Sequence, residues 1–212
     1  GPVLVVAPHP DDETIGAGGA LARHALAGDP VTVLVATSGE RTSGGGRRAE
    51  AVAVAREAEC RAACADLGVG EPVFLRLGDG ALRDQLRELT AAVGEYGRDA
   101  RVVYLPSLLD PHRDHRAANT AVAAAGLAVD TYGYEVWSPG PVDVVLDVTA
   151  VYERKEQALR RYATALESVD YVRAARGLAM YRSVAGGLGG SGSAEGFLWL
   201  PAHEHAALCA HL

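Results

Sequence analysis

Short apolar runs alternate with longer helix-like segments through the first part of the chain, and this alternation constrains the fold most strongly. The runs are rich in valine and leucine and stop at polar residues, as buried strands do. Strands are expected at residues 3–7, 31–36, 73–77 and 102–105, and helices at residues 15–27, 47–67, 82–96 and 114–125. Alternation of this kind predicts an α/β, Rossmann-like fold with a mainly parallel sheet and helices on both faces.

The C-terminal third contains two further strand-like runs, at residues 132–137 and 142–148. The turn-forming sequence Ser-Pro-Gly-Pro separates them at residues 138–141. Because so short a connection suits antiparallel strands, we expect an antiparallel addition at the sheet edge or beside the functional site. A charged amphipathic helix is expected over residues 151–165. No internal repeat or linker divides the sequence, so residues 1–212 are expected to form one domain.

Two polar clusters follow two of the expected strands. His-Pro-Asp-Asp-Glu occupies residues 9–13, directly after the strand at 3–7, and His-Arg-Asp-His occupies residues 112–115, soon after the strand at 102–105. Open α/β sheets bind their ligands at the carboxyl ends of the strands. We therefore expect the two clusters to meet in one crevice.

The spacing within the clusters suits a metal site. His9 and Asp12 are three residues apart, as are His112 and His115, so each pair can face one point. Catalytic zinc takes ligands of these types and keeps a position for water. Two carboxylates are then left for a general base and for orienting a ligand, namely Asp11 and Asp114. The competing interpretation is that the acidic residues only cap a helix and offset its dipole.

At these two motifs the sequence resembles the LmbE/PIG-L family of metal-dependent N-acetylglucosaminyl deacetylases. That family carries a strand followed by His-Pro-Asp-Asp-Glu and, later, a His-x-Asp-His motif. Shorter similarities extend over nearly the whole chain, at residues 37–40, 56–59, 67–69, 77–80, 135–137 and 194–197. Arg113 fills the variable position of the second motif, which leaves the substrate preference open.

The resemblance implies a role for each motif residue. It implies that His9, Asp12 and His115 bind Zn²⁺, with Fe²⁺ or another divalent metal as alternatives. Bound zinc lowers the pKa of water to about 7 and polarises an amide carbonyl. The resemblance implies that Asp11 is the general base. It implies that His112 stabilises the oxyanion or protonates the leaving amine, and that Asp114 orients an imidazole.

Three further polar residues are candidates for substrate binding: Arg56, Asp79 and Glu40. Arg56 either forms an ordinary surface pair with Glu59 on a helix or, as the resemblance implies, lies near the substrate. Asp79 and Glu40 follow strands, where each is either a turn residue or a partner for sugar hydroxyls. The glycine-rich segments 39–46 and 186–196 are either lids over the substrate or ordinary loops.

Several other features favour structural interpretations. The small residues 16–19 do not form the full dinucleotide-binding motif, and close packing of the first helix on the sheet explains them better. Cys60 and Cys64 are expected to be core thiols rather than a redox or metal pair. His203 and His205 are two residues apart, so they diverge on a helix, and a solvated surface is expected there.

Composition limits the classes of partner. The formal net charge is −7 and the basic residues are dispersed, which argues against a nucleic-acid or anionic membrane partner. No apolar run approaches the roughly 20 residues that span a bilayer, and no signal sequence is evident. Three cysteines are too few for a disulfide framework, so a cytoplasmic location is expected. The sequence leaves open whether the chain forms a homo-oligomer.

The leading hypothesis is a zinc-dependent hydrolase that removes an acetyl or other acyl group from a small amino-sugar conjugate. One alternative is an amidase for another amide, such as a thiol conjugate or an antibiotic intermediate, because loops rather than the metal motif set substrate choice. Others are a non-catalytic metal- or sugar-binding protein and a nucleotide-binding domain. Plain binding would not need Asp11 or His112, and their presence favours an enzyme.

Overall fold

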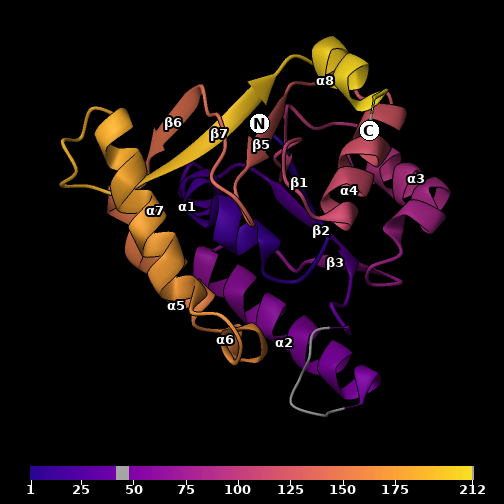
Figure 1. Cartoon of the computed structure of the whole chain (residues 1–212), viewed down its shortest axis with the longest axis horizontal. Helices are drawn as coiled ribbons and strands as arrows, with labels where there is room; N and C mark the ends of the chain where they lie inside the picture. The colour runs from indigo at the N-terminus through magenta and orange to yellow at the C-terminus, as the bar shows by residue number, and fades with distance from the viewer. Residues whose placement is uncertain (42–47, 212) are drawn as a thin grey trace.

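A seven-stranded sheet with the order β3-β2-β1-β4-β5-β7-β6 runs through the molecule (Figure 1). The computed structural model describes residues 1–41 and 48–211. Five strands are parallel: β1 (Val3–Ala7), β2 (Val31–Thr37), β3 (Val73–Leu77), β4 (Val102–Pro106) and β5 (Thr131–Tyr134). The strand order reverses direction between β1 and β4, so their carboxyl ends form a crevice of the kind that binds ligands. The mainly parallel sheet expected from the sequence is confirmed.

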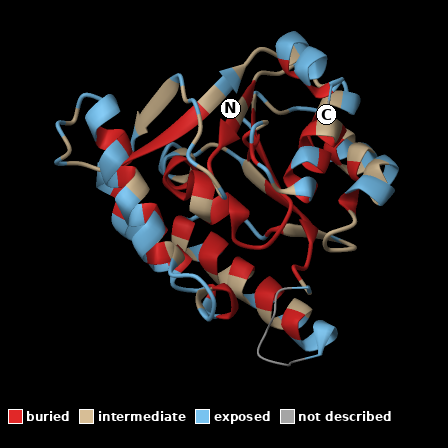
Figure 2. Ribbon diagram, viewed as in Figure 1, coloured by how far each residue is buried: buried red, intermediate tan, exposed pale blue. Residues whose placement is uncertain are grey.

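Helices cover both faces of the sheet, which explains the continuous apolar runs of the central strands. One face carries α1 (Asp12–Leu26), α2 (Ala49–Leu67) and α5 (Tyr152–Leu159). The other face carries α3 (Leu86–Tyr96) and α4 (Arg113–Ala124). A 3₁₀ turn (Leu82–Gln85) precedes α3. Val3 and Val5 pack into the first layer, whereas Leu4 and Val6 pack into the second. Figure 2 shows these buried strands between the two helical layers. No helix of the described residues has the length and apolar character needed to cross a bilayer.

The antiparallel addition is confirmed, but the two expected strands do not pair with each other. Strand β6 (Val144–Asp147) does not pair with β5; β7 (Ala194–Leu200) lies between them and is antiparallel to both. Strand β7 brings Phe197, which is 1% exposed, into the core, whereas the half-buried β6 takes the edge. The glycine-rich sequence before β7 obscured this strand. Residues 194–196 belong to β7, and none of residues 186–196 lines the pocket that contains His9 and His112, so the segment is not a lid over that pocket.

The helix expected over residues 151–165 is broken. A 3₁₀ turn (Thr149–Val151) precedes α5, and a short helix α6 (Ala163–Leu166) follows it; α7 (Tyr171–Ala185) is a further helix that the sequence did not indicate. The break lies at Tyr162, whose side chain is 1% exposed and whose hydroxyl donates to Glu13. The chain bends there because the ring enters the core beneath α1.

Glycines in α1 allow the helix to approach the sheet closely, as the sequence predicted. A Cβ atom on Gly16 would lie 2.2 Å from the ring of Tyr134, and one on Gly19 would lie 2.7 Å from Val148. The Tyr134 hydroxyl donates to the Val6 carbonyl at 2.9 Å, which fixes the ring against the helix. Cys60 and Cys64 are free thiols buried in the same layer, and their sulfur atoms and a Glu13 carboxylate oxygen lie within 4.8 Å of one another.

The prediction that both C-terminal histidines are solvated is wrong for His205. Helix α8 (Ala202–Cys209) packs against α4, and His205 is 2% exposed. Its Nε2 lies 2.9 Å from Asn119 Oδ1 and 3.5 Å from Cys209 Sγ. The two histidine side chains do diverge, but that of His205 points into the contact between α4 and α8.

Burial of His205 makes stability depend on pH. Burial lowers the pKa of His205 to about 4 from its usual 6.5. Between these values the unfolded chain binds a proton that the folded chain does not, so the free energy of unfolding falls as the pH falls. We expect this residue to lower the free energy of unfolding by about 2 to 4 kcal/mol between pH 7 and pH 4.

Urea titrations at both pH values test this expectation. The free energy of unfolding of His205→Gln should fall less over this range than that of the wild type. The exposed His203→Gln is the matched control, and a parallel response of both variants would contradict the assignment.

Candidate active site

The first motif turns sharply between β1 and α1. Asp11 has a φ of 124°, which is rare for a residue other than glycine. This turn lets α1 begin at Asp12 and brings that carboxylate back to His9, whose backbone N–H donates to Asp12 Oδ2 at 2.9 Å. Strained backbone of this kind is typical of functional sites. The motif therefore places His9 and Asp12 side by side at the end of the strand.

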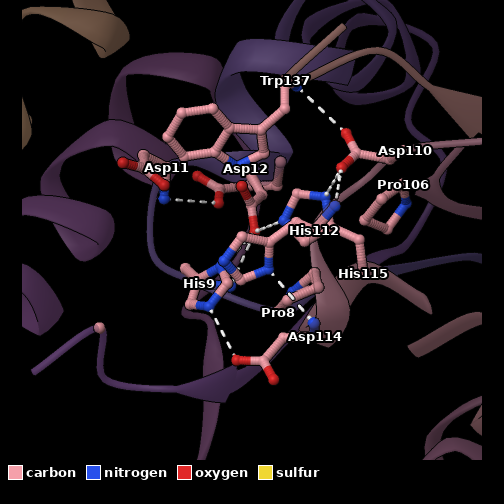
Figure 3. A network of polar contacts seen from close by, with 12 residues as sticks. Pro8, His9, Asp11, Asp12, Pro106, Asp110, His112, Asp114, His115 and Trp137 are labelled. Carbon is pink, nitrogen blue, oxygen red and sulfur yellow. Dashed lines mark hydrogen bonds and ion pairs between the residues drawn. The ribbon is translucent and has the colours of Figure 1, made fainter. Parts of the chain in front are cut away.

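The second motif begins α4. His112 is the N-cap, and its Nδ1 accepts a hydrogen bond from the Asp114 backbone N–H at 3.2 Å. His115, one turn into the helix, is completely buried. Because β4 lies next to β1 in the sheet, this helix end faces the first motif (Figure 3). The convergence expected from the sequence is present.

The two motifs meet at Asp12. Its Oδ2 lies 3.0 Å from His9 Nδ1 and 3.2 Å from His115 Nε2 (Figure 3). One carboxylate oxygen thus lies within 3.2 Å of an imidazole nitrogen from each motif. Ligand atoms of His9, His112 and His115 also lie within 4.8 Å of one another, which gives an alternative set of three.

The outer nitrogen of each imidazole contacts a further carboxylate. His9 Nε2 lies 3.2 Å from Asp114 Oδ2 and 3.3 Å from Asp79 Oδ1, and His115 Nδ1 lies 3.2 Å from Asp110 Oδ1. Metal-binding histidines commonly carry such a partner, which fixes the ring and the tautomer. Asp114 therefore faces His9, and Asp110 takes the equivalent place at His115.

These residues fit a divalent metal. Neither ring nitrogen of the buried His115 makes a well-aligned hydrogen bond with a described residue. Burial opposes a charge on either imidazole, yet Asp12 raises the pKa of His9 well above its usual range and that of His115 to about 9. The field at this point therefore favours positive charge, which a divalent cation bound by His9, Asp12 and His115 would supply.

Asp11 is a buried carboxyl held by Arg56. Its Oδ2 accepts from Arg56 Nη2 at 2.9 Å. Burial raises the pKa of Asp11 to about 7; Arg56 opposes this shift, and the neighbouring Asp12 and Glu13 carboxylates add to it. Arg56 is itself only 4% exposed, so the alternative of a surface pair with Glu59 is wrong. Instead, Glu59 accepts from Thr164.

His112 presents a donor to the pocket. Because Nδ1 accepts from the backbone, the neutral ring carries its proton on Nε2. Burial lowers the pKa of His112, and positive charge on His9 and His115 lowers it further. The ring stacks on Trp137, with 6.1 Å between centroids and 10° between planes. Packing therefore holds a neutral imidazole N–H beside Asp12.

These side chains open into a catalytic pocket of about 350 Å³. Six predicted site residues line it: His9, Asp11, Asp12, Arg56, Asp79 and His112. Glu40 does not line the pocket, because its carboxylate accepts from the Asp79 backbone N–H at 2.9 Å. Most of the proposed lid at residues 39–46 lies outside the described residues.

Sequence reasoning missed Asp110, Trp137 and Tyr171 as site residues. Trp137 and Tyr171 line the pocket, and Tyr171 comes from α7, which has no motif. Asp110 accepts from the backbone N–H groups of His112, at 2.9 Å, and Trp137, at 3.1 Å, in addition to its contact with His115. Its place between β4 and the second motif was the available signal.

We expect Asp110→Asn to lower kcat/KM by about 10- to 100-fold, the range typical of a partner that orients a metal-binding histidine. The amide keeps the size of the side chain but loses one carboxylate oxygen and the negative charge beside His115. Steady-state kinetics and metal titration of the variant test this expectation. Asp99→Asn, at an exposed position, is the control. Wild-type kinetics and metal affinity in Asp110→Asn would contradict the assigned role.

The chain is similar to known deacetylases and to a hydratase. Residues 4–126 match the family profile described as PIG-L: GlcNAc-PI de-N-acetylase. The probable N-acetyl-alpha-D-glucosaminyl L-malate deacetylase 2 of Bacillus subtilis (strain 168) is 31% identical over 191 residues, which cover 79% of this chain and 84% of that protein. The 1D-myo-inositol 2-acetamido-2-deoxy-alpha-D-glucopyranoside deacetylase of Rhodococcus erythropolis (strain PR4 / NBRC 100887) is 34% identical over 170 residues. The match covers 64% of this chain and 58% of that protein. The crystal structure of GalB, the 4-carboxy-2-hydroxymuconate hydratase of Pseudomonas putida KT2440, matches with a TM-score of 0.81 and 26% identity, covering 94% of this chain and 95% of GalB.

Proposed function

The chain belongs to the PIG-L family of GlcNAc-PI de-N-acetylases, and from this premise we propose that it is a metal-dependent N-deacetylase of small amino-sugar conjugates. The observation that carries the proposal is the position of Asp12 Oδ2, within 3.2 Å of His9 and His115, in a site that also holds Asp11 and His112. The pocket volume of about 350 Å³ suits a small molecule.

His9, Asp12 and His115 would hold the metal. The imidazole and carboxylate ligands suit zinc, and iron or another divalent ion is also compatible. Such an ion supplies Lewis-acid polarisation of the amide carbonyl and lowers the pKa of water. The outer contacts of Asp114 with His9 and of Asp110 with His115 keep the two rings oriented for binding.

The remaining residues divide the proton transfers between them. Asp11 is placed to take a proton from the attacking water, and its pKa of about 7 suits a base near neutral pH. Arg56 keeps this carboxylate in place. On the other side of the pocket, the Nε2–H of His112 can donate to the developing oxyanion or to the departing nitrogen. An amide nitrogen must be protonated before it leaves, so an acid is needed there.

Asp79 and Arg56 are the proposed substrate contacts that line the pocket. Asp79 Oδ2 accepts from the Arg41 backbone N–H at 2.8 Å, and its other oxygen faces His9, so the carboxylate is held at the pocket wall. Its oxygens can accept from sugar hydroxyls. Glu40 would act through Asp79 rather than by touching the substrate.

Product analysis tests the function directly. The purified, metal-loaded protein would be incubated with α-linked N-acetylglucosaminides that carry malate, inositol or methyl as the second group. We expect free amine and acetate in equal amounts from at least one of them. A folded, metal-loaded protein that releases neither product from any N-acylated sugar would contradict the proposal.

A hydratase is the second candidate, because GalB is similar over nearly the whole chain. A specific feature also favours a substrate with several carboxylates. The guanidinium nitrogens of Arg113 and Arg41 lie 2.8 and 3.3 Å from the point where a Cβ on Gly80 would be, at the pocket wall. Neither arginine forms an ion pair with a residue of the described part of the chain. Loss of the ultraviolet absorbance of 4-carboxy-2-hydroxymuconate, with no amidase activity, would favour this alternative.

A further inference from the structure

A second cavity of about 290 Å³ adjoins the catalytic pocket. We call it the apolar chamber; α7 forms one side of it, on the flank of the molecule where β6 and β7 lie (Figure 1). Its apolar walls comprise Ile15, Val136, Trp137, Leu178, Ala175 and Ala179. Part of its lining is exposed, so the chamber opens to solvent: Trp137 is 54% and Val169 39% exposed.

The chamber and the catalytic pocket share part of their lining. Five residues line both spaces: Ile15, Val136, Trp137, Val169 and Tyr171. Trp137 also stacks on His112, so the shared wall reaches the residue that would donate to the reacting amide. The chamber therefore lies directly beside the centre at which the substrate would react.

The charged residues around the chamber are already paired. Lys155 Nζ lies 2.6 Å from Glu195 Oε1, and Glu195 also accepts from the backbone N–H groups of Gly19 and Ala20. Arg182 donates to both oxygens of Glu135. These pairs neutralise the charged side chains, and most of the remaining lining is apolar. The chamber therefore suits a hydrocarbon group.

Small side chains keep the chamber open. Ala175 and Ala179 on α7 line it. The largest apolar hollows next to convergent polar groups are commonly ligand sites.

We propose that the apolar chamber holds a hydrocarbon substituent of the substrate, several carbons long, while the amide lies at the catalytic centre. This inference rests on the proposed deacetylase function and narrows its substrate class. The hydrocarbon is either the N-acyl chain itself or an alkyl group on the sugar. Either group would place an alkyl chain in the chamber, and two series of substrates distinguish the two possibilities.

Two substrate series test the proposal by amine release. In one, methyl glycosides of glucosamine carry N-acetyl, butanoyl, hexanoyl or octanoyl groups. In the other, N-acetylglucosamine carries methyl, butyl, hexyl or octyl aglycones. Each buried methylene can contribute about threefold, so we expect kcat/KM to rise tenfold or more along one series. A rise in the first series identifies the acyl chain, and a rise in the second identifies the aglycone. Flat or falling values in both would overturn the proposal.

Filling the chamber should abolish the preference. Ala175→Leu is expected to lower the octyl-to-methyl or octanoyl-to-acetyl ratio of kcat/KM at least tenfold, and Ala179→Leu provides a second variant should the first fold poorly. Ala185→Leu makes the same change on an exposed part of α7 that does not line the chamber, and it should keep the wild-type ratio. Equal ratios in all these proteins would count against the chamber.

A binding measurement separates this inference from the proposed function. 1-Octanol should raise the melting temperature of the wild type and of Ala185→Leu, but not of Ala175→Leu, because a ligand of the folded state stabilises it. If no N-acylated sugar is turned over while octanol still gives this pattern, the proposed function fails and the chamber stands as a hydrocarbon site. If neither turnover nor octanol stabilisation is observed, both fail.

Discussion

Asp11→Asn is expected to lower kcat by about two to four orders of magnitude, the contribution typical of a general base. Asparagine suits the test because it tolerates the positive φ of this position and keeps an oxygen that can accept from Arg56. The turn between β1 and α1 should therefore persist, while the group that takes the proton is lost. Metal binding is expected to be unchanged.

The measurement is single-substrate kinetics by amine release, together with metal titration of the same preparation. Asp99→Asn serves as the matched control at an exposed position and should behave as wild type. Turnover of Asp11→Asn within a few-fold of wild type would remove Asp11 from the role of base. Loss of metal instead would place this carboxylate among the ligands.

The two histidines of the second motif are expected to fail in different ways when each is replaced by alanine. His115→Ala removes the nitrogen 3.2 Å from Asp12 Oδ2, so metal affinity should fall by more than the 10- to 100-fold typical of an outer partner. His112→Ala should keep the metal and lose about 100- to 1,000-fold in kcat, as when a donor to an oxyanion is removed.

Competition titration with a zinc-binding dye measures the first effect, and kinetics at saturating metal measures the second. The exposed His203→Ala is the control for the loss of an imidazole. Swapped results would mean that His112 is a ligand and that the set of His9, His112 and His115 is the correct one. Identical behaviour of both variants would leave no reason to separate the two roles.

The centre of the fold and most of the site were predictable from local sequence. Val3–Ala7 is a continuous apolar run because helices cover both faces of β1, and that pattern is visible without a structure. The residues at 9–13 must then emerge at the carboxyl end of this strand. The same reasoning holds for β4, and parallel pairing of the two strands brings the motifs together.

Features set by long-range packing were not predictable in this way. Strand β7 lies between β5 and β6 because of pairing with residues more than forty positions away, and its own preceding sequence is rich in glycine. His205 is buried because α8 packs on α4, and Tyr162 breaks a helix by reaching Glu13. Asp110 has no motif of its own; its three acceptor contacts depend on where His112, His115 and Trp137 come to lie.

The metal content of the purified protein, by elemental mass spectrometry after extensive dialysis, tests the central claim most directly. Asp12 Oδ2 lies within 3.2 Å of His9 and His115, where the field favours a cation, so the account predicts close to one divalent metal per chain. His115→Ala prepared in parallel should contain far less. A folded wild-type protein that retains no metal, and takes up none when zinc or iron is supplied, would contradict the account at its first requirement.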